Sequence, residues 1–248
     1  MVNLLDELVR QLYYPATFSG ATMPLVNRAP DLWTVDHALA IGGFLPLGTR
    51  TTIVRLGDGR LLVHAPGKLE DADVTAIRAL GPVAAIVAPN RLHHLFFDAA
   101  RAAFPEAEGW AAPGVEKLVK TPLTGTYDGR GGPWSGTLEL HALAGAPKME
   151  ETVLYDPRSR TLVMTDLCFN IRHVDGWFAR ANLKMLDAYG RFGPSWLCRN
   201  VYIGDKTALR RSIDHLLTWD FDRVVLAHGD VVETGGREGL RAAFAWMK

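Results

Sequence analysis

The sequence predicts an α/β protein in which two packed β-sheets carry helices on their outer faces. Short apolar runs with strand-like patterns alternate with amphipathic helical stretches, and this alternation occurs on both sides of about residue 120, as two related halves. The chain has 248 residues, of which 48% are hydrophobic and 22% charged, so it is long enough to bury a large core. We therefore expect a sheet sandwich with helices outside it.

The first 31 residues are expected to form a helix and an extended arm that precede the main domain. Leu4, Leu5, Leu8 and Leu12 fall on one face of an amphipathic helix. The stretch after it, up to about residue 31, is rich in turn-forming residues and is expected to lie over the body of the domain. The remaining residues, 32–248, are predicted to form one domain with an irregular or helical insertion at about 169–206.

The first half of this domain is predicted to contain a β-α-β-α-β unit. Two strands are expected to pair through a turn at Gly57-Asp58-Gly59, and a helix with acidic residues in its first turn ends near Gly81. The run after that helix is apolar without interruption, which is typical of a strand buried on both faces. The expected strands cover residues 32–43, 50–59, 60–67, 83–89 and 108–114, and the expected helices cover 69–81 and 93–104.

The second half is predicted to contain three strands followed by a helix, a strand and a helix. A helix beginning near Thr207, which can cap it, has an apolar stripe on one face. A buried strand follows, and a last helix closes the domain. The expected strands cover residues 136–143, 151–157, 160–167 and 223–229, and the expected helices cover 207–220 and 236–247.

Composition excludes several classes of function. The 27 basic residues balance the 27 acidic ones, so we expect neither nucleic acid nor a membrane as partner. No apolar run approaches the roughly 20 residues that span a bilayer, which makes a cytoplasmic location the default expectation. Cys168 and Cys198, the only cysteines, are expected to be reduced core thiols. The sequence also lacks a Gly-x-Ser-x-Gly elbow, a phosphate loop and a dinucleotide fingerprint.

Three apolar strands run into residues of metal-binding type. His93 and His94 follow the strand at 83–89, Asp166 ends the strand at 160–167, and His228 ends the strand at 223–229. Loops at the carboxyl ends of neighbouring strands converge, so these side chains are expected to meet. Imidazole and carboxylate together suit zinc, iron or manganese, which would acidify a bound water and polarise a substrate oxygen. Each residue alone is more typical of a core histidine or a turn aspartate, but the set favours a site.

Four segments carry a resemblance to a known superfamily: LGPVAAIVAPNRLHH, FPEAEGWAAPGVEK, ETVLYDPRSRTLVMTDLCFN and FDRVVLAHGDVVETGG. At these residues the chain resembles the metallo-β-lactamase fold superfamily and, within it, the family DUF4336. The resemblance extends from about residue 32 to residue 247. It implies a four-layer αββα sandwich whose metals lie at one edge of the two sheets.

The resemblance also shows where this chain departs from the superfamily. The first motif of the superfamily is His-x-His-x-Asp-His, and here Pro89 and Arg91 occupy the first two histidine positions. His93 falls on the aspartate and His94 on the last histidine. Asp166 matches the usual bridging aspartate, and His228 matches the terminal histidine.

The departures imply a reduced metal site. The remaining histidine of the first metal position has no counterpart in residues 143–151, where Glu150 and Glu151 are expected to be a solvated pair or, alternatively, to supply an oxygen ligand. The resemblance therefore implies that the first metal has lost its ligands. One divalent ion (zinc, iron or manganese) is expected instead. Its expected ligands are His93, His94, Asp166 and His228.

The favoured function is a metal-dependent hydrolase of an ester, amide or phosphoester. Asp166 is the candidate proton acceptor. Arg91 is hypothesised to hold Asp166 ionised or to orient an anionic group of a small-molecule substrate. The alternative is that Arg91 is a solvated loop residue. A non-catalytic protein that binds a ligand or a partner and an iron-dependent oxidoreductase remain open. An aromatic-rich insertion could cover the pocket or a homodimer partner. Its aromatic residues are Trp177, Phe178, Tyr189, Phe192 and Trp196.

Overall fold

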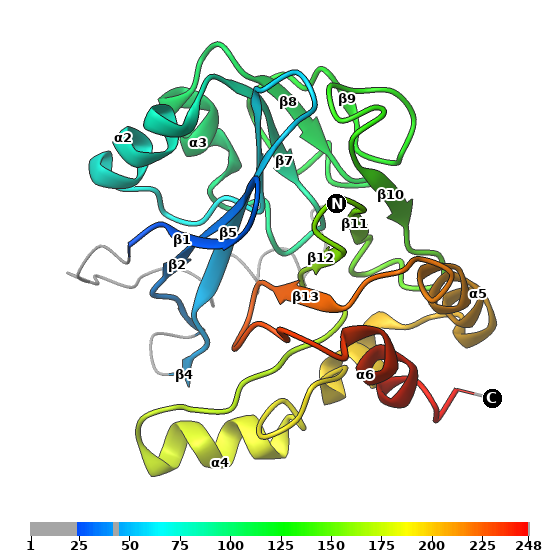
Figure 1. Cartoon of the computed structure of the whole chain (residues 1–248). Coiled ribbons are helices and arrows are strands. Elements are labelled where there is room, and N and C mark those ends of the chain that lie inside the picture. Colours follow the sequence, from blue (N-terminus) through cyan, green and yellow to red (C-terminus); the bar gives the residue numbers. More distant parts are fainter. Residues whose placement is uncertain (1–23, 42–44, 248) are drawn as a thin grey trace.

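Two sheets face each other and helices cover their outer surfaces, which gives the predicted four-layer αββα sandwich (Figure 1). The structure is a computed structural model and describes residues 24–41 and 45–247. The helix predicted near the N-terminus and most of the predicted arm lie outside the described residues. No helix in the described part of the chain is long and apolar enough to cross a membrane.

The first sheet has seven strands in the order β1-β2-β5-β6-β7-β8-β9. Strands β6, β7 and β8 are parallel and are joined by helices α2 (Asp71–Leu80) and α3 (Phe97–Ala103), which confirms the predicted β-α-β-α-β unit. The predicted turn between β5 and β6 is also present. The strands are β1 (Val26–Ala29), β2 (Leu32–His37), β5 (Thr49–Arg55), β6 (Leu61–His64), β7 (Val83–Ala88), β8 (Glu108–Ala111) and β9 (Gly125–Thr126).

The second sheet has four strands in the order β10-β11-β12-β13. The first three are antiparallel, whereas β12 and β13 are parallel, with Met164 opposite Leu226. Asp166 and His228 each lie two residues beyond this pair, so the register brings both side chains to one edge of the sheet. The strands are β10 (Glu139–Ala142), β11 (Thr152–Asp156), β12 (Thr161–Met164) and β13 (Arg223–Leu226), and the helices on their outer face are α5 (Lys206–Leu216) and α6 (Gly236–Ala243).

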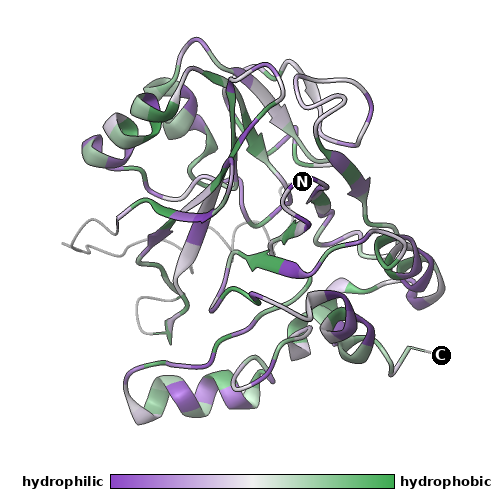
Figure 2. Ribbon diagram, viewed as in Figure 1, coloured by the Kyte–Doolittle hydropathy of each residue, from purple (hydrophilic) through white to green (hydrophobic). Residues whose placement is uncertain are grey.

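Hydrophobic side chains fill three layers. Between the sheets, residues such as Val87 of β7 and Val225 of β13 share one cluster. A second cluster joins the first sheet to α2 and α3 through Ile77 and Phe97, and a third joins the second sheet to α5 and α6. Figure 2 shows hydrophobic residues along the central strands and mixed faces on the helices. The strand ends therefore project from a rigid core.

The structure differs from the predictions mainly at element ends. Helix α5 begins after Asp205, whose side chain accepts a hydrogen bond from Ala208 N at 3.0 Å, so Thr207 is not the cap. The strand predicted over 32–43 ends at His37, and β3 (Ala40–Ile41) pairs instead with β4 (Leu45–Pro46). Strands β1 and β9 were not predicted, and the insertion contains α4 (Trp177–Met185) and a π-helical turn at Cys198–Tyr202.

Candidate metal centre

The carboxyl ends of three strands bring His93, Asp166 and His228 together. Each offers one ligand atom, and these atoms all lie within 4.8 Å of one another. His93 Nε2 is 3.2 Å from Asp166 Oδ2 and 3.2 Å from His228 Nε2, and His228 Nε2 is 3.4 Å from Asp166 Oδ1. All three side chains are almost fully buried, with at most 8% exposed. Two imidazoles and one carboxylate form a donor set that fits zinc or iron(II).

His94, which was expected among the ligands, is not part of this group of three. Its Nδ1 lies 2.8 Å from the carbonyl oxygen of Arg91. The helix predicted to begin at His93 begins instead at Phe97, so residues 93 and 94 lie in a tight turn. Neighbouring side chains in such a turn point in different directions. The structure thus brings together three of the four expected ligands.

His228 is held in the orientation that a metal ligand needs. Its Nδ1 lies 2.7 Å from the carbonyl oxygen of Gly48, and a carbonyl can only accept, so Nδ1 carries the proton. Nε2 is then the ring nitrogen that faces the cluster, and it is the atom that would bind a metal. Arg50 donates to the carbonyls of Leu226 and Gly229 at 2.8 and 2.9 Å, which fixes the loop around His228 against the first sheet.

Asn90 connects the loops that carry His93 and Asp166. Its Nδ2 donates to Thr165 Oγ1 at 2.8 Å and to Asp166 Oδ2 at 2.6 Å. Its Oδ1 accepts from the backbone N–H groups of Leu92 and His93 at 2.9 and 2.7 Å. Asn90 is fully buried and uses all its usual hydrogen-bonding capacity, so it positions both loops at once.

The Asp166 carboxyl is ionised in this environment. Burial opposes its ionisation, but the interactions of the carboxyl with His93 and His228 outweigh that effect and hold its pKa well below its usual range. A proton acceptor works best with a pKa near the working pH. The arrangement therefore favours Asp166 as a ligand over the proton-acceptor role expected from the sequence.

Glu151 is not a solvated residue, because it is only 1% exposed. Its carboxylate accepts hydrogen bonds from the backbone N–H groups of Thr165, Asp166 and Leu167 at 2.6, 2.8 and 2.9 Å. Burial and then the charge of Asp166 raise the pKa of Glu151 to about 7, against the effect of these donors. Glu151 therefore holds the backbone of the Asp166 loop through its carboxylate. The expectation that Glu150 and Glu151 are a solvated pair is wrong for Glu151.

Arg91 and Glu150 form a partly buried ion pair beside the cluster. Arg91 Nη1 lies 3.1 Å from Glu150 Oε2 and 3.3 Å from the carbonyl oxygen of Gly114. Among the described residues, the side chains that contact the Asp166 carboxylate are Asn90, His93 and His228. The charge of Arg91 is thus shared with Glu150, and neither side chain belongs to the ligand group.

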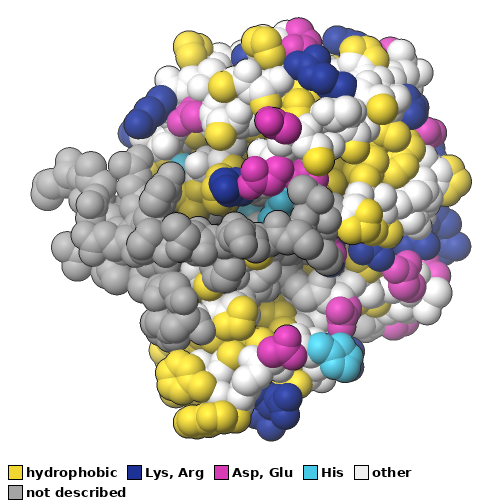
Figure 3. All heavy atoms as spheres, turned by 90° about the vertical axis from the view of Figure 1, so that its left-hand side faces the viewer, with side chains coloured by type: hydrophobic (Ala, Val, Ile, Leu, Met, Phe, Trp, Pro, Cys, Tyr) yellow, Lys and Arg dark blue, Asp and Glu magenta, His cyan; other side chains and the backbone are white. Residues whose placement is uncertain are grey.

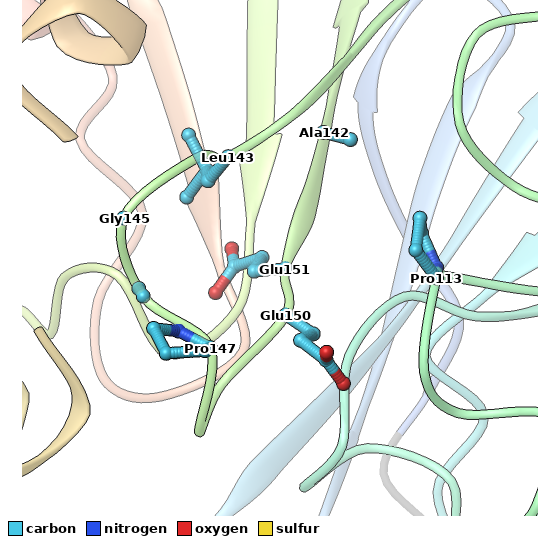
Figure 4. A pocket seen from close by; sticks show the side chains of 8 residues that line it. Pro113, Ala142, Leu143, Gly145, Pro147, Glu150 and Glu151 are labelled. Atoms are coloured by element: carbon cyan, nitrogen blue, oxygen red, sulfur yellow. The ribbon is translucent and has the colours of Figure 1, made fainter. Parts of the chain in front are cut away.

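Two cavities lie in this part of the domain, and of the three grouped residues only His93 lines one of them. One has a volume of about 340 Å³ and includes both Glu150 and Glu151 in its wall (Figure 4). A much smaller one, of about 10 Å³, lies against His93. Figure 3 shows acidic, basic and histidine side chains close together near the middle of one face. The larger cavity is lined by Pro113, Ala142, Leu143, Gly145, Ala146, Pro147, Glu150 and Glu151.

His64 is a residue near the centre that the sequence reasoning missed. It ends strand β6, next to β7 in the sheet, and is 1% exposed. Its Nε2 has no hydrogen-bond partner among the described residues. Burial, with a smaller contribution from the charge of His93, lowers the pKa of His64 to about 3, so the imidazole is neutral. The signal was present, because a fourth apolar strand ends in a histidine.

The remaining candidates lie outside the centre. Cys168 and Cys198 are buried, and no disulfide joins them, as expected for core thiols. Burial raises the pKa of the Cys168 thiol well above its ordinary value, which disfavours the reactive thiolate. His173 is exposed on the insertion and is a surface histidine.

The layers and the group at the strand ends define a protein of the metallo-β-lactamase fold, and solved structures agree. The DIM-1 metallo-β-lactamase matches with a TM-score of 0.66 and 12% identity over 93% of this chain and 100% of its own. The metallo-β-lactamase FIM-1 from Pseudomonas aeruginosa, in its mono-zinc form, matches with a TM-score of 0.64 and 10% identity over 93% of this chain and 96% of its own. The Flv1 flavodiiron core from Synechocystis sp. PCC6803 matches with a TM-score of 0.61 and 13% identity over 92% of this chain and 62% of its own.

The family assignment is more specific than the fold. Residues 30–176 match the family described as "Domain of unknown function (DUF4336)". The chain belongs to this family, as a divergent member of the metallo-β-lactamase fold. A sequence search of curated proteins found no match.

Proposed function

We propose that the protein is a metal-dependent hydrolase with one divalent cation held by His93, Asp166 and His228. The observation that carries this proposal is the convergence of two imidazole nitrogens and a carboxylate oxygen within 4.8 Å. The mono-zinc form of FIM-1 is a precedent in the same fold for a single metal. A divalent metal here would supply an activated water and polarise an ester, amide or phosphoester oxygen of the substrate.

The residues of the chain prepare the site for this reaction. The hydrogen bond between His228 Nδ1 and Gly48 turns Nε2 towards the centre, and Asn90 fixes the Asp166 carboxylate relative to His93. A 340 Å³ cavity with mainly apolar walls lies beside Glu151, which accepts a hydrogen bond from the Asp166 backbone, and its size suits a small molecule, the class of substrate that we propose. We assign Asp166 to metal binding. Arg91 remains a candidate for orienting an anionic group only if its pairing with Glu150 opens.

An iron-dependent oxidoreductase is the second candidate. Two histidines and one carboxylate are also the ligand set of mononuclear iron(II) oxygenases. The similarity to the Flv1 flavodiiron core places an iron protein among the structural neighbours. The identity of the bound metal is therefore the observation that separates the two candidates.

Metal analysis followed by activity assays tests the proposal. The full chain, purified without added metal, should contain close to one equivalent of zinc by mass spectrometry and hydrolyse one of a panel of chromogenic esters, amides and phosphoesters. His228→Ala should lose both metal and hydrolysis, whereas His173→Ala, at an exposed histidine, should retain both. Iron with dioxygen-dependent oxidation would favour the second candidate. Metal-free protein that fails to bind added zinc or iron would contradict both and leave a non-catalytic binding protein.

A further inference from the structure

Helix α4 carries an apolar face on each side. On its inner side, Ala179 and Leu183 are buried in a cluster with Leu47 and Ile171. On its outer side, Trp177 is 80% exposed and Met185 is 72% exposed. These two residues lie eight positions apart with the exposed Ala181 midway, which places all three on one side of the helix. A helix at the surface of a soluble domain normally has polar residues there.

A second exposed tryptophan lies near the end of this helix. The backbone N–H of Trp196 donates to the carbonyl of Leu186 at 2.7 Å, and the Trp196 side chain is 47% exposed. Helix α4 is at the periphery of the molecule in Figure 1, and Figure 3 shows large hydrophobic side chains at the lower edge of the face that it borders. We call Trp177, Ala181, Met185 and Trp196 the α4 patch.

The α4 patch lies in a basic part of the chain. Helix α4 has two cations, Arg180 and Lys184, and no acidic residue, and both cations are exposed. Across residues 169–206 the sequence has six basic and three acidic residues, although the whole chain is neutral. Of the three acids, Asp187 pairs with two arginines and Asp205 caps α5, which leaves Asp175. The segment that carries the patch is therefore net positive.

We propose that the α4 patch docks the protein on the surface of an anionic lipid bilayer. Tryptophan and methionine would enter the headgroup boundary, where an amphipathic tryptophan side chain is favoured, and Arg180 and Lys184 would contact the headgroup charges. The expectation that no membrane is a partner was based on the net charge of the whole chain, which does not describe this local surface. Docking adds a location to the hydrolase proposal but does not depend on it.

A second copy of the chain fits the patch less well. Trp177, Met185 and Trp196 expose together roughly 400 Å², taking about 150–250 Å² for a fully exposed large side chain, and a stable dimer needs about 800 Å² from each partner. A twofold contact would also bring the cations of one copy against those of the other. The charge of the surface favours an anionic partner.

Vesicle sedimentation tests docking with the full chain. We expect binding to vesicles of phosphatidylcholine and phosphatidylglycerol, and little binding to phosphatidylcholine alone. Trp177→Ser with Met185→Ser should weaken partitioning at least about tenfold, since each substitution removes the burial of a large apolar side chain. Arg180→Ser with Lys184→Ser should reduce the preference for anionic vesicles by up to about 30-fold.

The control is Trp246→Ser, which removes a less exposed tryptophan (37%) near the C-terminus, outside the α4 patch, and should bind like the wild type. Circular dichroism would verify that each variant is folded. Wild-type protein that stays in the supernatant with anionic vesicles would overturn docking. Equal binding to neutral and anionic vesicles would also overturn docking. A dimer seen by light scattering in the wild type, and lost in Trp177→Ser with Met185→Ser, would overturn it as well.

Discussion

Replacing Asn90 by alanine should strongly destabilise the protein, because this buried side chain makes four hydrogen bonds. The substitution leaves the backbone N–H groups of Leu92 and His93 without their acceptor, at about 1–3 kcal/mol each. It also removes a donor from the charged Asp166, which is worth roughly 1.5–3 kcal/mol. Water entering the space would recover part of this cost, so we expect a loss of about 4 kcal/mol. Stability of a whole domain is about 5–15 kcal/mol.

Urea unfolding of metal-free protein, followed by circular dichroism, measures this loss. Asn200→Ala is the matched control, since its single hydrogen bond to the Trp196 carbonyl is exposed, and it should change stability by no more than about 0.5 kcal/mol. If Asn90→Ala lost less than about 1.5 kcal/mol, the idea that Asn90 holds the two loops together would be refuted. Asn90→Asp should also be destabilised at neutral pH, because it brings a second carboxylate against Asp166.

Three further predictions follow from the geometry around the centre. His64 has a pKa of about 3 in the folded protein and about 6.5 in the unfolded chain, so between these pH values only the unfolded chain binds the proton. The free energy of unfolding should therefore fall by about 1.4 kcal/mol for each pH unit below about 6.5. Urea unfolding at several pH values should show a smaller dependence on pH for His64→Gln than for the wild type. Gly229→Ala should lower the melting temperature and the metal content, because Gly229 has φ +86° and a Cβ there would lie 2.4 Å from the Asn170 backbone. A variant with the melting temperature and metal content of the wild type would contradict this prediction. Arg91→Met should cost only about 1 kcal/mol in urea unfolding, since its pair with Glu150 is partly exposed, and a loss above about 3 kcal/mol would show a larger role for Arg91.

The sequence was sufficient to predict the layers and the edge where the centre lies. Apolar runs identified β7, β12 and β13, and the rule that strand ends converge located His93, Asp166 and His228 together. Applying the same rule to β6 would have added His64. These successes depend on hydrophobic periodicity, which a single sequence records directly, and on the parallel strands that an alternation of strands and helices implies.

What could not be predicted depends on side-chain direction and on distant partners. Periodicity does not say which of the adjacent His93 and His94 turns inward, because the helix begins only at Phe97. Glu151 is near its three backbone donors only after β11 and β12 have paired. The pair between Arg91 and Glu150 likewise joins residues that are 59 positions apart in the chain. Such contacts are properties of the packed fold.

The hydrogen bond between His228 and Gly48 also has a consequence for the order of events in folding. The two residues are 180 positions apart, and Arg50 spans a similar separation to reach the same loop. Contacts this distant in sequence form late, because a long segment of chain must be ordered before they can be made. The metal binding that we propose should therefore be acquired in the last stage of folding, and a refolding time course that follows metal uptake would report when the two halves have docked.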